Sequence, residues 1–242
     1  NSVSRSFSSV IQQLPEQLRD SVCNFYLVLR ALDTIEDDTG LPEEVRLKWV
    51  RDFHQVLNQP DWKLEGIGTQ DGYKQLLAHF YKIIHEFQTL PSHSQEVIQK
   101  ITKEMGTGMN IFLSKEVVEW EDYNNYCHYV AGLVGIGLSE LFVTHGYENK
   151  DLASNIGLSN SMGLFLQKTN IIRDYHEDLT ESRIFWPTCV WSKYANQLKD
   201  FNSAPYHPKS LACLNELVND VLKHATDSIC YLSMLSNKEI FR

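Results

Sequence analysis

Apolar residues recur every three or four positions along most of the chain, which is the spacing of one face of an α-helix. Proline, glycine and short polar clusters separate these segments, and no run of alternating polarity predicts a β-strand. We therefore predict an all-α fold in a single domain over residues 1–242, with loops at 59–72 and 180–208. The expected helices span 15–38, 43–57, 73–90, 94–118, 122–145, 151–179 and 210–235, and the segment 151–179 is expected to be one long helix with a break near Gly157.

One short acidic pattern, Asp-x-x-Glu-Asp, occurs twice, each time at the end of an apolar helical segment. The spacing i, i+3, i+4 places all three carboxylates on one face of a helix, where like charges repel each other. A positive partner is therefore needed. The two triplets are Asp33, Glu36 and Asp37, and Asp174, Glu177 and Asp178.

The residues around each triplet place it on a polar stripe of a helix that is otherwise apolar. At 100° per residue, Tyr26 and Arg30 share a face with Asp33 and Asp37. A carboxylate buried without a partner is costly, and the C-terminal end of a helix, where the first triplet lies, also disfavours anions. In the second copy, the stripe consists of Gly163, Gln167, Asn170, Asp174 and Asp178. Two such stripes could face each other across one cavity.

Three interpretations of the triplets remain open at this point: solvated helix ends, a calcium site and a magnesium site. An EF-hand loop needs acidic residues at alternate positions around a central glycine, which neither triplet has. Mg²⁺ fits better, because it takes one or two carboxylates and completes its shell with phosphate oxygens. Arg30 and Arg173 could donate to the same phosphates. The apolar segment 126–138 indicates either plain helix packing or the wall of a cavity for a prenyl diphosphate.

Composition narrows the function further. The net charge of −9 disfavours non-specific nucleic-acid binding. The five cysteines lie outside any CxxC pattern, so we expect reduced thiols on the cytosolic side. The longest apolar stretch, 129–143, is shorter than the roughly twenty residues of a membrane span, so we expect none in this chain. A GxGxxG loop and a P-loop are both absent from the sequence.

Four motifs together resemble the eukaryotic squalene synthases, collinearly and over essentially the whole chain. They are Val3–Phe7, the run from Phe25 to Asp38 (FYLVLRALDTIEDD), the run from Tyr126 to Gly135 (YCHYVAGLVG), and the run from Gln167 to Asp178 (QKTNIIRDYHED) followed by Arg183 and Phe185-Trp186-Pro187.

The resemblance implies an all-α isoprenoid synthase fold, a single helical bundle around a central apolar cavity. It also implies a prenyltransferase of sterol biosynthesis that joins two farnesyl diphosphates head to head into presqualene diphosphate and reduces this intermediate to squalene. Mg²⁺ and NADPH are the implied cofactors. The whole protein is expected to be a monomer held on the cytosolic face of the endoplasmic reticulum by a C-terminal anchor that lies outside this chain.

The resemblance also assigns roles to individual residues. Both acidic triplets would hold Mg²⁺, with Asp33, Asp37, Asp174 and Asp178 counted as catalytic. Tyr126 would serve proton removal or cation stabilisation in the first step, and Phe7 would stabilise cations through its ring. Arg5, Arg30 and Arg173 would contact the cofactor. The substrate would contact Ser4, Ser6, Tyr26, Val130, Val134, Leu138, Met162, Leu166, Gln167, Asn170 and Arg183.

Two local departures from the family pattern are interpreted as peripheral. The loop before Arg183 lacks its usual glycine and has Thr180-Glu181-Ser182, and Glu140 replaces a basic or neutral residue. The chain also ends where the family continues, which puts the NADPH-dependent step in doubt for this piece. Three alternatives remain: a phytoene or dehydrosqualene synthase that does not reduce its product, a non-catalytic binding relative, and a plain helical scaffold.

Overall fold

The computed structural model describes residues 7–241, and all elements in that range are helical, without a β-strand. The 3₁₀ segments are η1 (Phe53–Asn58) and η3 (Leu198–Ser203), and η2 (His128–Gly132) is π-helical. The α-helices are α1 (Phe7–Ile11), α2 (Glu16–Glu36), α3 (Glu43–Asp52), α4 (Asp71–Ala78), α5 (Phe80–Thr89), α6 (Ser92–Phe112), α7 (Trp120–Cys127), α8 (Leu133–Thr144), α9 (Lys150–Ser154), α10 (Ile156–Arg173), α11 (Tyr175–Thr180), α12 (Thr188–Trp191), α13 (Pro208–Leu222), α14 (Ala225–Met234) and α15 (Lys238–Phe241).

Three of the expected helices are broken in the structure. The segment 73–90 is interrupted at His79, and 210–235 is interrupted between α13 and α14. The segment 151–179 breaks at Asn155, close to the expected position near Gly157, and again at Asp174, whose ψ of 7° leaves the helical range. The expected loop 180–208 was also wrong in part, because it contains α12 and η3.

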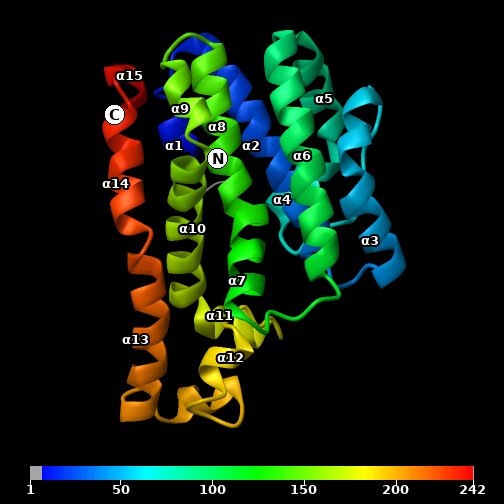
Figure 1. Cartoon of the computed structure of the whole chain (residues 1–242). Coiled ribbons are helices and arrows are strands. Elements are labelled where there is room, and N and C mark those ends of the chain that lie inside the picture. Colours follow the sequence, from blue (N-terminus) through cyan, green and yellow to red (C-terminus); the bar gives the residue numbers. More distant parts are fainter. Residues whose placement is uncertain (1–6, 242) are drawn as a thin grey trace.

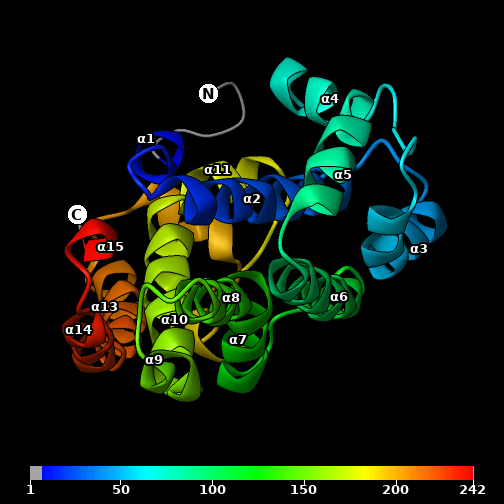
Figure 2. The same ribbon diagram turned by 90° about the horizontal axis from the view of Figure 1, so that it is seen from above.

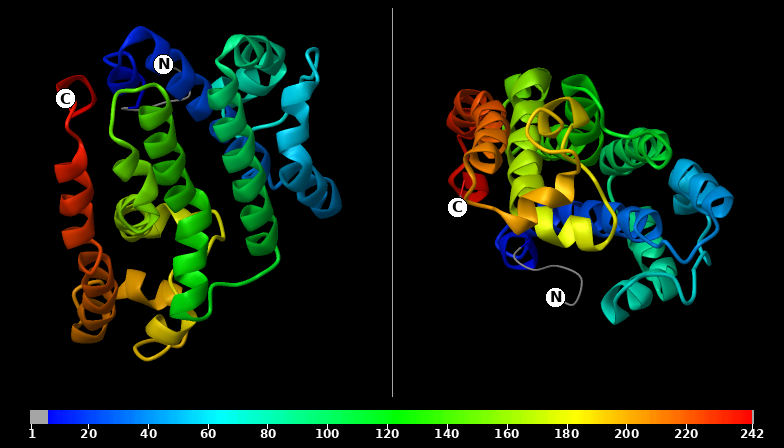
Figure 3. Two further views of the ribbon diagram at one scale, coloured as in Figure 1. Left: turned by 45° about the horizontal axis from the view of Figure 1, so that its top comes forward. Right: turned by 90° about the horizontal axis from the view of Figure 1, so that it is seen from below.

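The central part of the bundle consists of α8 and α10, which run side by side (Figure 1). Helices α13 and α14 follow one another along one edge of the molecule and pack against α10, and α3 lies near the opposite edge (Figures 1 and 3). Helix α2 packs against α6 and α8 and is seen along its length from above (Figure 2). The ends of α2 and α10, which carry the acidic motifs, are thereby brought to the same part of the bundle.

Two hydrophobic clusters stabilise this arrangement. One is built largely from α2, α5, α6 and α8, and the other from α7, α10, α12 and α13. Val130, in the π-helical turn between α7 and α8, packs against both clusters. The cavity described below lies at this junction.

Glycines allow α8 and α10 to approach each other backbone to backbone. A Cβ on Gly163 would lie 2.4 Å from the carbonyl oxygen of Ala131, and one on Gly135 would lie 2.4 Å from that of Ser159. Any larger side chain at either position would push the helices apart. The small residues of the 126–138 segment therefore serve helix packing at these positions.

The continuous helix Trp120–Thr144 is long and apolar enough to cross a membrane, by length and composition alone. Our expectation of no such segment rested on the shorter apolar run 129–143, and the helix extends beyond that run. In this structure the helix packs between α6 and α10 in the middle of the bundle. The same test is passed by core helices of globular proteins.

Candidate active site

Both acidic motifs line a single cavity of about 290 Å³ at the junction of α2, α7, α10 and α11. The wall combines carboxylates, two arginines, amides and a few apolar side chains. It is formed by Arg30, Asp33, Glu36, Asp37, Met109, Tyr126, Val130, Gln167, Asn170, Ile171, Asp174, Asp178, Arg183 and Phe185.

The first motif lies at the C-terminal end of α2 and is partly neutralised by Arg30. The Arg30 guanidinium lies 3.5 Å from Asp33, one turn along the same helix. It is held between two aromatic rings, at 5.8 Å from the centroid of Tyr26 and 5.9 Å from that of Tyr73. Because these rings restrict its movement, Arg30 presents a fixed positive charge to the cavity.

The second motif lies where α10 ends and α11 begins. Arg173 donates two hydrogen bonds of 2.7 Å to the two carboxylate oxygens of Asp174. Asp178 is buried, whereas Glu177 is exposed and lies outside the cavity wall. The structure therefore brings five of the six expected carboxylates to the cavity.

Arg183 joins the two motifs. Its Nη1 donates to Asp37 Oδ1 at 2.7 Å, and its Nη2 donates to Asp178 Oδ1 at 3.2 Å. Its backbone N–H also donates to the Asp178 carbonyl oxygen at 2.8 Å, which closes the turn after α11. Residues far apart in the sequence are thus linked through one side chain.

Burial raises the pKa of four carboxyl groups around the cavity. The pKa of Asp33 rises to about 6 and that of Glu36 to about 8, since removal from water disfavours the charged form and neighbouring carboxylates add repulsion. Burial likewise raises the pKa of Asp178 to about 6 and that of Asp37 above its usual range. A cation at this site would lower the cost of keeping these groups ionised.

Tyr126 is buried in the cavity wall between two aromatic rings. Its ring stacks on that of Phe185, with centroids 4.8 Å apart and planes at 19°, and contacts Phe112 edge-on at 5.5 Å. Burial raises its pKa well above the ordinary value, and the nearby carboxylates raise it further. Tyr126 therefore stays a neutral phenol, which suits a hydrogen-bond donor better than a base.

The donor set fits magnesium ions that share their shell with a phosphate-bearing ligand. Carboxylate oxygens are the ligands that Mg²⁺ prefers, and it commonly takes one or two from the protein. Across residues 7–241, no three His, Cys, Asp or Glu side chains form a group able to hold a metal ion by themselves. The remaining ligands would therefore come from water and from the substrate.

Several residues expected at the site lie away from this cavity wall. Val134, Leu138 and Met162 are half-buried on α8 and α10, and Leu166 is 48% exposed. Phe7 is exposed on α1, with its ring 5.7 Å from that of Tyr26, and Arg173 is exposed beside Asp174. Ser4, Arg5 and Ser6 fall outside the described residues.

Sequence reasoning missed three wall residues, Met109, Ile171 and Phe185. Phe185 belongs to a motif that carried the resemblance, but its position gave no sign of a contact with Tyr126. Met109 follows two glycines of α6, which is not a recognisable signal. These residues reach the cavity only through the packing of separate helices.

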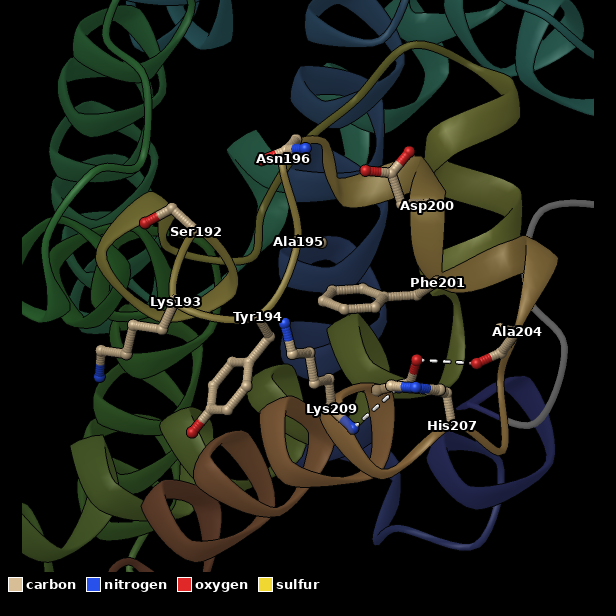
Figure 4. A pocket seen from close by; sticks show the side chains of 11 residues that line it. Ser192, Lys193, Tyr194, Ala195, Asn196, Asp200, Phe201, Ala204, His207 and Lys209 are labelled. Carbon is tan, nitrogen blue, oxygen red and sulfur yellow. Dashed lines mark hydrogen bonds between the residues drawn. The ribbon is translucent and has the colours of Figure 1, made fainter.

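A second hollow of about 350 Å³ lies apart from the acidic motifs, between the loop after α12, η3 and the start of α13 (Figure 4). Its wall includes Lys193, Phe201, His207 and Lys209. Lys193 is paired with Glu216 at 2.9 Å, so its charge is already balanced. This hollow shares none of the residues expected to carry chemistry.

The profile of the squalene/phytoene synthase family matches residues 1–242. The chain belongs to this family. It is 51% identical to squalene synthase from Nicotiana benthamiana and 53% identical to squalene synthase 1 from Panax ginseng, covering 99% of this chain and 58% and 57% of those proteins. The chain thus spans little more than half the length of these curated relatives.

Solved structures agree with this assignment. The structure described as TcSQS with the ligand BPH1237 has a TM-score of 0.95 at 44% identity, covering 99% of this chain and 70% of that one. A dehydrosqualene synthase matches with a TM-score of 0.68 at 20% identity, which shows a shared fold alone. The expectations of an all-α isoprenoid synthase fold and of squalene synthase relatives are confirmed.

Proposed function

We propose that this chain is the larger part of a squalene synthase, which condenses two farnesyl diphosphates head to head and reduces the product to squalene. The observation that carries this proposal is the single cavity lined by both carboxylate motifs, Arg30 and Tyr126. Two anionic clusters facing one space suit two diphosphates neutralised by Mg²⁺. The squalene synthases that it resembles at about half identity favour this substrate class over other prenyl diphosphates.

In this proposal, Asp33, Glu36 and Asp37 hold Mg²⁺ for one diphosphate, and Asp174 and Asp178 serve the other. Glu177, which lies outside the cavity wall, would join them only through a rearrangement of its exposed side chain. When bound, Mg²⁺ supplies charge neutralisation to a leaving diphosphate. Gln167 and Asn170 present amide groups to the same space. The arginines add fixed donors for phosphate oxygens.

The apolar and aromatic residues of the wall, Met109, Val130 and Phe185, would shield a cationic intermediate from water. In the first step, the carbon–oxygen bond of one farnesyl diphosphate breaks, and the double bond of the second molecule supplies the electrons for the new carbon–carbon bond. A proton is then lost as the cyclopropane ring closes, and the released diphosphate accepts it. Tyr126, kept neutral by burial, orients this exchange from the wall.

The reductive step is proposed for the longer protein. NADPH would supply a hydride, and Arg5, Arg30 and Arg173 would contribute positive charge for this anionic cofactor. The endoplasmic reticulum membrane, a C-terminal anchor, a monomeric state and a place in sterol synthesis belong to the same proposal.

Product analysis tests the proposed function. The longer protein that contains this chain is incubated with farnesyl diphosphate and Mg²⁺, with and without NADPH, beside an Asp174→Ala control. Squalene formed only with NADPH, and lost in the control, is the expected result. Presqualene diphosphate alone would restrict the activity to the first step, and dehydrosqualene would assign the chain to the non-reducing branch. No product from a folded protein that binds the substrate would indicate a binding relative.

A further inference from the structure

Arg183 lies between the two acidic motifs and pairs with a carboxylate of each. It contacts Asp37 of the first motif, Asp178 of the second, and Glu181 at 2.6 Å on its own loop. Arg30 and Arg173 each pair within their own motif, Arg30 with Asp33 and Arg173 with Asp174. Among the described ion pairs, those of Arg183 are the ones that cross from α2 to α11.

The local backbone directs this side chain into the site. Ser182 has a φ of +60°, which is a left-handed conformation that residues other than glycine rarely adopt. The turn places the guanidinium of Arg183 over the ring of Phe185, 5.8 Å from its centroid, and toward both carboxylates. Its Nε is buried without a hydrogen-bond partner, so the two carboxylates hold the group through its Nη atoms.

We propose that Arg183 is an exchangeable counter-ion, which neutralises the two motifs before a divalent cation binds and gives up Asp37 and Asp178 when it does. The inference rests on the proposed function and deepens it. The oxygens that Arg183 occupies, Asp37 Oδ1 and Asp178 Oδ1, are ones that a cation would need. Once released, the guanidinium is free to bind a diphosphate oxygen.

Competition distinguishes this role from a simple diphosphate-binding role. If Arg183 occupies the carboxylates, it opposes the binding of a divalent cation in the absence of any diphosphate. A residue that only binds diphosphate would leave that affinity unchanged. The measurement is therefore the binding of Mn²⁺ alone, as a paramagnetic substitute for Mg²⁺, by electron paramagnetic resonance of the free ion without prenyl substrate.

Arg183→Gln is expected to bind Mn²⁺ alone about fivefold more tightly than the wild type, because one positive charge has been removed from a partly solvated site. Lys193→Gln is the matched control. It removes the same charge beside Glu216, away from the motifs, and should bind Mn²⁺ like the wild type. Arg183→Lys keeps the charge and should also stay close to the wild type, which guards against an effect of altered folding.

Mn²⁺ binding by the variants distinguishes failure of the counter-ion role from failure of the proposed function. If the wild type binds Mn²⁺ and Asp174→Asn weakens it, while Arg183→Gln binds no more tightly than the wild type, the counter-ion role is overturned and the proposed function stands. If Mn²⁺ binds neither the wild type nor Arg183→Gln, the counter-ion role is overturned, because removing the guanidinium then frees no cation site, and product analysis alone decides the proposed function. Tighter binding in Arg183→Gln and unchanged binding in Lys193→Gln support the inference.

Discussion

Individual residues around the second motif shape the site in ways that their sequence context does not indicate. The loop 180–182 lacks the glycine that the family resemblance led us to expect, and we interpreted that difference as peripheral. The structure corrects this interpretation, because Ser182 adopts a left-handed backbone conformation immediately before Arg183. A serine there stores strain beside a residue that joins both motifs.

Replacing Ser182 with glycine is expected to stabilise the protein by about 1 kcal/mol, since a left-handed conformation costs a residue with a Cβ roughly that amount. Urea unfolding of the wild type and Ser182→Gly measures the difference. Ser182→Ala keeps the Cβ and should show no such gain. Equal stabilisation by alanine and glycine would contradict strain as the cause.

Tyr126 allows a prediction about the chemistry. Tyr126→Phe removes only the hydroxyl of a neutral, buried phenol, so substrate binding should persist while the rate of presqualene diphosphate formation falls about 100-fold, as for other lost donors in active sites. Single-turnover measurements separate the two quantities. Tyr123→Phe on the same helix removes a buried hydroxyl outside the cavity wall and should leave the rate unchanged. An unchanged rate in Tyr126→Phe would remove this residue from the chemistry.

The residues that face the cavity from within one helix could be predicted from the sequence, and the contacts between helices could not. The i, i+3, i+4 spacing was enough to place Asp33 and Asp37 on the stripe of Arg30. The contact of Arg183 with Asp37 joins residues 146 positions apart, and it depends on how α2 and α11 are packed. The local periodicity of the sequence contains no information about which helices pack against each other.

At the scale of elements, the position of α10 in the bundle is set by its close contact with the helix Trp120–Thr144. The glycines that permit this contact were visible in the sequence, and so was the apolar face of α10. The π-helical turn at His128–Gly132 was not, although it is held by a 2.7 Å hydrogen bond between His128 Nδ1 and Asn160 Oδ1 from α10. The break at Asp174 was also missed, because no glycine or proline marks that position in the sequence.

Two glycines of α10 offer a matched test of this packing. Gly163→Ala would place a Cβ 2.4 Å from the Ala131 carbonyl oxygen, so we expect a loss of about 2 kcal/mol in the free energy of unfolding. Gly157→Ala meets nothing within 4 Å and should leave stability unchanged or raise it by about 0.5 kcal/mol. Urea unfolding compares the two variants, and equal effects would contradict the close contact of the helices.

For the whole molecule, a buried polar network connects the bundle behind the cavity. Lys168 of α10 is fully buried and donates to Asn124 at 2.6 Å, to Asp220 at 2.5 Å and to His224 Nε2 at 3.0 Å. These partners lie on α7, α13 and the turn before α14. Lys168 follows Gln167 of the cavity wall, so the network holds the orientation of α10 toward the site. The sequence placed Lys168 inside a motif without indicating that it is buried.

This network predicts how stability depends on pH. His224 accepts a hydrogen bond from Lys168 and must be neutral to do so, and its pKa is lowered by burial and by that ammonium group. Asp220 and Asp227 oppose this shift and Lys223 adds to it. Because the unfolded chain takes up a proton near pH 6.5 and the folded chain only at lower pH, the contribution of His224 to stability is lost as the pH falls below that value.

The stability advantage of the wild type over His224→Gln should therefore narrow as the pH is lowered from 7 to 5. The quantity to compare is the difference in the free energy of unfolding between the wild type and the variant at each pH, because other groups titrate in the same range. Burial also lowers the pKa of His145, which has the same sign, and it raises the pKa of Asp33 and Asp178, which has the opposite sign. Urea unfolding at each pH measures the effect, with His85→Gln on the exposed surface of α5 as the control. A difference that stays constant with pH would show that His224 does not hold α10 through a neutral ring.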